Sequence, residues 1–225
     1  MVVAEPAEAR VKATPSGGTR ELLLNTAERL FAERGINGVS LREIGLACHQ
    51  RNNGVTQYHF GDKAGLVRAV FERRAAEVNA RRLQLLDKAT RQGRDSVPDL
   101  IRAYVEPLAE QIERENFYVP FLSRLQAEHQ RDELLQPVNE AVNTAFTRVR
   151  RQLRRHLNSR PSGLFRNRLR LAVNLAFDAL ADQQARLSKT EPGTLPLGEF
   201  VDDLVVAISG LLMAPTGVRR DPPLT

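Results

Sequence analysis

Apolar residues recur at intervals of three and four along most of the chain, and this helical spacing constrains the fold more than any other feature. A half-buried strand would instead alternate apolar and polar residues between tight turns, and no segment of the sequence follows that pattern. We therefore predict an all-α protein. The predicted helices form a small N-terminal bundle followed by a larger helical bundle.

Capping residues and glycines divide the N-terminal bundle into short helices. Thr19 is the predicted N-cap of the first helix, which ends at Gly35. Ser40 and Glu43 have the spacing of a capping box, which begins a second helix. A short third helix is expected over residues 53–59. Three helices with a tight turn between the second and third are typical of a helix-turn-helix.

Asp62 can cap a long fourth helix that connects the two bundles and extends to about residue 86. Residues 89–97 are expected to form a linker. The helices predicted after it cover residues 98–115, 118–130, 137–157, 164–187 and 197–213. The predicted domain organisation is a disordered arm (1–18), a helix-turn-helix domain (19–66), a ligand-binding and dimerisation domain (87–213) and a flexible tail (214–225).

The composition is that of a water-soluble protein inside the cell. Hydrophobic residues make up 42% of the 225 residues, and no apolar run approaches the roughly 20 residues of a membrane helix. The N-terminus lacks the pattern of a secretory signal. Cys48 is the single cysteine, so no internal disulfide can form. We expect a cytoplasmic protein whose net charge of +6 is compatible with binding nucleic acid.

The segment around the third helix carries side chains suited to reading DNA. Residues 50–57 read Q-R-N-N-G-V-T-Q, and glutamine and asparagine pair with adenine while arginine pairs with guanine. The candidates for base contacts are Arg51, Asn52, Asn53, Thr56 and Gln57. Tyr58, His59 and Lys63 follow as donors for phosphate oxygens.

These residues resemble the DNA-binding domain of the tetracycline-repressor (TetR) family over about residues 19–75. The resemblance rests on A-E-R-L-F at residues 27–31, on Gly35, Ser40 and Ile44, and on Y-H-F-G-D-K-A-G-L at residues 58–66. It implies that Ser40 and Arg42 touch phosphate, that Asn52, Asn53, Thr56 and Gln57 face bases, and that Tyr58, His59 and Lys63 anchor the backbone. It also implies a C-terminal domain that dimerises and binds an inducer.

Two positions depart from the family pattern. Cys48 and His49 occupy the turn where the family usually has Ala-Gly, and histidine adopts a positive φ less readily than glycine. Gly54 is expected inside the third helix, where glycine costs about 1 kcal/mol relative to alanine. The turn is therefore predicted to be altered or slightly strained.

The second bundle is the predicted site of an unknown effector, apolar or anionic. The candidate pocket residues are Tyr104, Phe117, Tyr118, Phe121, Leu125, Phe146 and Phe177, for which core packing is the alternative. An arginine-rich stretch over residues 148–170 is interpreted mainly as a solvated face, with one or two side chains holding an anion as the alternative.

The last two helices are apolar around much of their circumference, so we expect them to form a homodimer interface. The apolar residues available to it are Leu169, Val173, Phe177, Leu180, Val201, Val205, Ile208 and Leu212. The predicted function is that of a repressor that a small molecule releases from a palindromic operator in double-stranded DNA.

A non-specific DNA-compacting protein is the alternative, and an enzyme on an all-helical scaffold is a weaker one. No phosphate-binding loop or nucleophile elbow is present in the sequence. Cys48, His49 and His59 lack a fourth ligand and the usual zinc spacing. We therefore expect no enzymatic activity, no cofactor and no metal.

Overall fold

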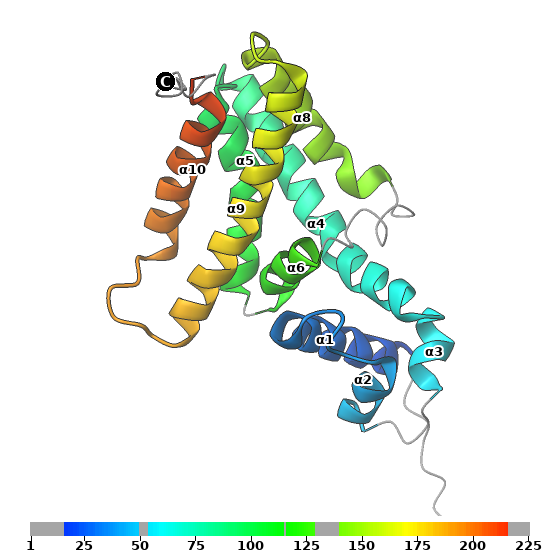
Figure 1. The fold of residues 1–225 in the computed structure, drawn as a ribbon. Coiled ribbons are helices and arrows are strands. Elements are labelled where there is room, and N and C mark those ends of the chain that lie inside the picture. The colour runs from blue at the N-terminus through cyan, green and yellow to red at the C-terminus, as the bar shows by residue number, and fades with distance from the viewer. Residues whose placement is uncertain (1–15, 50–53, 115, 129–139, 216–225) are drawn as a thin grey trace, which may run out of the picture.

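The structure is a computed structural model that describes residues 16–49, 54–114, 116–128 and 140–215 (Figure 1). All regular elements in these ranges are helices, which confirms the all-α prediction. They are α1 (Ser16–Arg34), α2 (Leu41–Ala47), α3 (Val55–Phe60), α4 (Lys63–Arg91), α5 (Val97–Glu113), α6 (Tyr118–Ala127), the 3-10 helix η1 (Glu140–Asn143), α8 (Thr144–His156), α9 (Ser162–Ser188) and α10 (Leu197–Met213). No helix within the described ranges is both long and apolar enough to cross a bilayer.

Helices α1, α2 and α3 lie together at one end of the molecule, and α4 leads from them into the larger bundle (Figure 1). Leu23, Ile44 and Leu66 are fully buried and bring α1, α2 and α4 onto one core. The Asp62 carboxylate accepts the Gly65 N–H at 2.6 Å, so the predicted cap of the fourth helix is confirmed.

The larger bundle consists of α5, α8, α9 and α10, with α6 between it and α1 (Figure 1). Ser96 and Asp99 form a capping box that begins α5. Helices α9 and α10 pack against each other along one edge of the molecule, and α10 also packs on α5. This arrangement buries one face of α10 inside the protomer and leaves the other face outward.

The apolar residues predicted for a dimer interface are buried inside the protomer, so that part of the prediction is wrong. All eight lie between 0% and 8% exposed, because these helices turn their most apolar faces toward α5, α6 and each other. The outward face carries other apolar side chains. They are Leu171 and Leu175 on α9, and Val206 and Met213 on α10, exposed by 40%, 36%, 68% and 46%.

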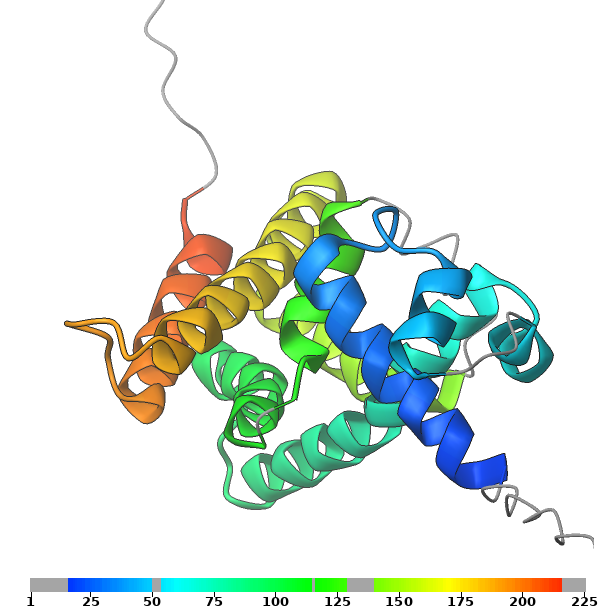
Figure 2. The ribbon, with the colours of Figure 1, turned by 90° about the horizontal axis from the view of Figure 1, so that it is seen from below.

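The helix-turn-helix unit contacts the larger bundle through α6 as well as through α4. Helix α1 packs along both α4 and α6 (Figure 2). One continuous cluster of buried apolar residues extends from Leu23 in α1 to Leu212 in α10. The two predicted domains therefore share a core, in which α6 packs directly on α1.

Several helix boundaries differ from the predicted ones, including those of α1 and α4. Helix α1 begins at Ser16, before the predicted cap Thr19, so Thr19 lies within the helix and does not cap it. Helix α4 continues to Arg91 and ends where Gly93 takes a φ of 65°. The linker to α5 is therefore shorter than the predicted segment 89–97.

Candidate nucleic-acid interface

Helix α2 begins with the capping box that the sequence predicts. The Ser40 Oγ accepts the Glu43 N–H at 3.2 Å, and the Ser40 N–H donates to Glu43 Oε2 at 2.8 Å. Arg34 Nη2 donates to Glu43 Oε1 at 2.7 Å. The hydrogen bond from Arg34, followed by those from Ser40, lowers the pKa of Glu43 from 4.5 to about 2. Glu43 therefore remains charged at physiological pH and joins the end of α1 to the start of α2.

The turn after α2 contains a residue with positive φ, as expected from His49 standing where a glycine is usual. His49 adopts a φ of 56°, while Cys48 is only 3% exposed and its thiol donates to Thr26 Oγ1 at 3.1 Å. A left-handed conformation costs a non-glycine residue about 1 kcal/mol or more. The strained residue therefore lies between the two helices that define the DNA-binding motif.

Helix α3 is shorter than predicted and starts later. Gly54 is its N-cap, with a φ of −87°, and does not lie inside the helix. The expected helix-interior penalty for this glycine is therefore wrong. Thr56 is also displaced from its predicted role, because it is 1% exposed and packs toward α2, where a Cβ on Gly45 would lie 3.3 Å from its Oγ1. Thr56 is packed between α3 and α2 and cannot face bases in this conformation.

The opposite face of α3 is open to solvent. Gln57 is exposed, and Tyr58 is 84% exposed, the largest value among the exposed apolar and aromatic side chains. His59 lies edge-on to Tyr58, with ring centroids 5.2 Å apart. Lys63, at the start of α4, is half-buried near this surface. The outer face of α3 and the start of α4 thus carry polar and aromatic hydrogen-bond donors, whereas the inner face of α3 is packed against the rest of the domain.

Phe60 fixes the C-terminal end of α3. It is partly buried against the apolar core, and the Arg20 guanidinium lies 5.2 Å from its ring centroid. Arg42 is exposed on α2, and Ser40 is exposed with its hydroxyl engaged in the capping box. The predicted contacts Arg51, Asn52 and Asn53 lie outside the described residues.

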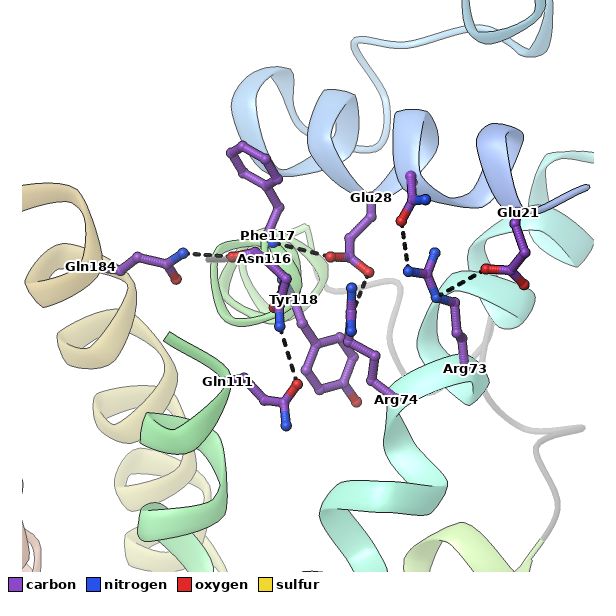
Figure 3. Close-up of polar contacts among 10 residues, drawn as sticks. Glu21, Glu28, Arg73, Arg74, Gln111, Asn116, Phe117, Tyr118 and Gln184 are labelled. Carbon is purple, nitrogen blue, oxygen red and sulfur yellow. Dashed lines mark hydrogen bonds and ion pairs between the residues drawn. The ribbon is translucent and has the colours of Figure 1, made fainter. Parts of the chain in front are cut away.

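A buried polar network joins this unit to the larger bundle (Figure 3). Glu28 of α1 is 2% exposed; its Oε2 accepts Arg74 Nε at 2.9 Å and its Oε1 accepts the Phe117 N–H at 3.0 Å. The carbonyl oxygen of Asn116 accepts Gln184 Nε2 at 2.6 Å. The corner between α5 and α6 thus contacts α1 directly and α9 through one hydrogen bond.

A second set of contacts closes the other end of the junction. The Glu128 carboxylate accepts the N–H groups of Ile36 and Asn37 at 2.7 and 3.0 Å. Arg124 Nε donates to the carbonyl of Ala32 at 3.3 Å. The roles of Glu28 and Glu128 could not be predicted from the sequence, because a single acidic residue on a helix gives no signal of its partner.

The aromatic residues predicted to line a ligand pocket divide among several places. Tyr104, Tyr118, Phe146 and Phe177 border one cavity of only about 30 Å³, roughly the volume that one water occupies in the liquid. Phe121 and Leu125 are buried outside that cavity, and Phe121 packs on Phe31 of α1 with ring centroids 6.3 Å apart. Phe117 lines a separate and much larger cleft.

The cation beside this small cavity comes from α4 and not from the arginine-rich stretch. Arg82 borders the cavity, its guanidinium lies 4.0 Å from the Tyr104 ring centroid, and its Nε donates to the Tyr104 carbonyl at 3.0 Å. The sequence analysis did not single out Arg82, which has the same residue type as many surface arginines.

Several arginines of the stretch 148–170 bind parts of the protein itself. Arg148 pairs with Asp87 at 2.5 Å, and Arg154 donates to the carbonyl of Arg160 at 2.8 Å. Arg160 and Arg168 donate to carbonyl oxygens at the end of α10, which lack helical partners. Arg150, Arg151, Arg155 and Arg166 are exposed. The stretch thus combines helix-terminating contacts with a solvated face.

A capped second helix, a tight turn and a third helix with one fixed and one open face define a helix-turn-helix DNA-binding protein. Residues 23–70 match the family described as "Bacterial regulatory proteins, tetR family". The matched residues are the DNA-binding domain of a transcriptional regulator of that family. A search of curated proteins found no match. No group of three or more His, Cys, Asp or Glu side chains within the described ranges could hold a metal ion.

Proposed function

We propose that this chain is a repressor that binds a palindromic operator as a homodimer and leaves it when a small molecule binds the larger bundle. The observation that carries the proposal is the division of α3 into two faces. Thr56 is buried against α2, whereas Tyr58 is 84% exposed beside the exposed Gln57. Tyr58 is therefore little buried in the protomer, and a tyrosine hydroxyl is suited to a phosphate contact.

The DNA contacts then fall into two kinds. Gln57, together with Arg51, Asn52 and Asn53 just before α3, would read base edges in the major groove. Tyr58, His59 and Lys63, with Ser40 and Arg42 from α2, would hold the phosphate backbone. Thr56 is left out of this proposal because of its burial.

The outward faces of α9 and α10 support the homodimer. Leu171, Leu175, Val206 and Met213 are large apolar side chains exposed on neighbouring helices. Clusters of this kind on a folded protomer mark interaction surfaces. A two-fold axis through this surface would present two copies of α3 to one duplex, as a palindromic operator requires.

Release by an effector is supported by the junction between α1 and α6. Glu28, Arg124 and Glu128 connect the DNA-binding unit to the larger bundle on both sides of α6. A ligand that prefers one position of α6 therefore changes the position of α1, and the coupling between two such sites is typically 1–3 kcal/mol.

Nuclease footprinting on DNA selected from a random pool distinguishes this function from DNA compaction. A repressor protects one symmetric site, whereas a compacting protein protects DNA diffusely. Gln57→Ala should cost about 1–3 kcal/mol on the selected site and relax its preference at one base pair per half-site. Lys63→Ala should weaken binding to all sequences and lower the salt slope by about one. Diffuse protection by the unchanged protein would favour compaction.

A further inference from the structure

A cleft of about 1040 Å³ lies between α1, the α5–α6 corner and α9. We propose that this cleft binds an amphipathic organic cation, and that this cation is the effector that releases the protein from DNA. The effector role rests on the repressor function proposed above. The cleft is far larger than the cavity of about 30 Å³ around Tyr104 and Phe146, so it can hold a small molecule without rearrangement of the core.

One part of the cleft wall is apolar and open to solvent. Ile112, Phe117, Pro120, Ala181, Leu187 and Leu197 line it. Phe117 is 37% exposed and Leu187 is 36% exposed. Figure 3 shows the Phe117 ring directed away from Arg74 and Tyr118, although the backbone N–H of the same residue is bound to Glu28. An apolar ligand body would cover these side chains, and the face of Phe117 attracts cations.

The charged side chains of the wall determine the sign of the charge that a ligand must carry. Four carboxylates line the cleft, against one guanidinium from Arg124; they belong to Glu33, Glu113, Asp178 and Asp182. This excess of negative charge is local, because the whole chain carries a net charge of +6. A cation is therefore attracted to the cleft, whereas the anionic effector considered from the arginine-rich stretch would be repelled.

Two of these carboxylates are available to a ligand. Glu33 pairs with Arg29 at 3.3 Å, and Asp178 accepts the Ser123 hydroxyl at 2.7 Å. Within the described part of the chain, no cation lies within ion-pair distance of Glu113 or Asp182. They come from α5 and α9, on two walls of the cleft.

Gln184 adds an acceptor on the same side. Its Nε2 donates to the Asn116 carbonyl, and its Oε1 is buried without a hydrogen-bond donor from any described residue. A buried acceptor without a donor costs free energy that a ligand N–H would recover. An ammonium ligand would satisfy this oxygen in addition, whereas a cation without an N–H gains only the attraction of the carboxylates.

The position of the cleft links it to DNA binding. Ala32 and Glu33 of α1 form part of the wall, and the Ala32 carbonyl accepts Arg124 Nε from α6. A ligand here touches the DNA-binding unit and the larger bundle at once. It therefore shifts the protein toward whichever relative position of α1 and α6 binds it more tightly.

Calorimetric titration of the full chain without DNA tests the site. Tetraphenylphosphonium is the probe, and tetraphenylborate, of the same shape and opposite charge, is the control ligand. The phosphonium should bind and the borate should not. The double variant E113Q/D182N should weaken phosphonium binding about tenfold. Glu72→Gln, which removes an exposed carboxylate outside the cleft, should leave binding unchanged.

Equal binding of the two ions, no binding of the phosphonium, or an unchanged affinity in the double variant would each overturn the site. The effector role has its own test: bound phosphonium should reduce affinity for the selected DNA, and DNA should reduce affinity for the phosphonium by the same factor. Phosphonium binding that leaves DNA affinity unchanged would overturn the effector role. Because the first titration contains no DNA, its outcome does not depend on the proposed repressor function.

Discussion

Glu28 of α1 and Arg74 of α4 form an ion pair with a 2.9 Å contact, and only 3% and 17% of their side-chain surfaces are exposed. The same Glu28 carboxylate accepts the Phe117 N–H, so one buried group holds three elements together. A charge buried at such a place is strongly coupled to its partner, because removal of one leaves the other without compensation.

Glu28→Gln should therefore destabilise the protein by about 2–3 kcal/mol, since it leaves the Arg74 guanidinium mostly buried without its counter-ion. Urea unfolding followed by circular dichroism measures this change. Glu33→Gln is the matched control, because it breaks the exposed Arg29–Glu33 pair and should cost less than about 1 kcal/mol. Equal losses in the two variants would show that the buried pair has no special role.

His49→Gly should stabilise the protein by about 1 kcal/mol. His49 has a φ of 56°, a conformation that glycine adopts without a Cβ penalty. Thermal unfolding checks the gain, and Thr190→Gly, at a φ of 52° in the loop before α10, should give a similar one. A lower melting temperature for His49→Gly would mean that the imidazole makes contacts that outweigh the strain.

Acid should weaken the start of α2 through Glu43, whose pKa is lowered from 4.5 to about 2. A carboxylate with a lowered pKa in the folded state contributes stability above pH 4.5, and this contribution is lost as the pH falls from 4.5 to 2. Unfolding measured across this window should show a smaller dependence on pH for Glu43→Gln than for the unchanged chain. Identical pH dependence in both proteins would contradict the assignment.

Charge on the outward face of α9 and α10 should separate the proposed dimer. The double variant L175E/V206E places carboxylates where apolar side chains would meet, and it should weaken dimerisation at least tenfold in sedimentation experiments. Leu46→Glu changes a leucine on α2 whose exposure, 54%, lies between those of Leu175 and Val206, and it should leave the dimer intact. Dimers of unchanged strength in the double variant would place the interface elsewhere.

The sequence predicts the elements whose signals are local. Ser40 with Glu43, and Asp62, begin their helices as expected, because a cap and its bonded N–H lie within three residues. Which face of a helix turns inward is decided by distant neighbours. Thr56 therefore looked like a base contact although it packs toward Gly45.

Contacts between residues far apart in the sequence could not be predicted either. Glu128 binds the N–H groups of Ile36 and Asn37, and Glu113 and Asp182 line one cleft. The last two helices are apolar on more than one face, as the sequence predicts. Their strongest apolar positions proved to be core, and the outward face is occupied by Leu171, Leu175 and Val206.

Selection of bound duplexes from a pool of random DNA by the full chain tests whether this regulator reads a palindromic operator as a dimer. We expect one enriched inverted repeat whose half-site centres lie about 34–36 Å apart, or a multiple of that distance, because two copies of α3 must enter major grooves on the same side of the duplex. The enriched sequence should bind at least about a thousandfold more tightly than the starting pool at physiological salt. Recovery of DNA with no enriched sequence, or of a single half-site without symmetry, would contradict the proposal that this regulator is a dimeric reader of a palindromic operator.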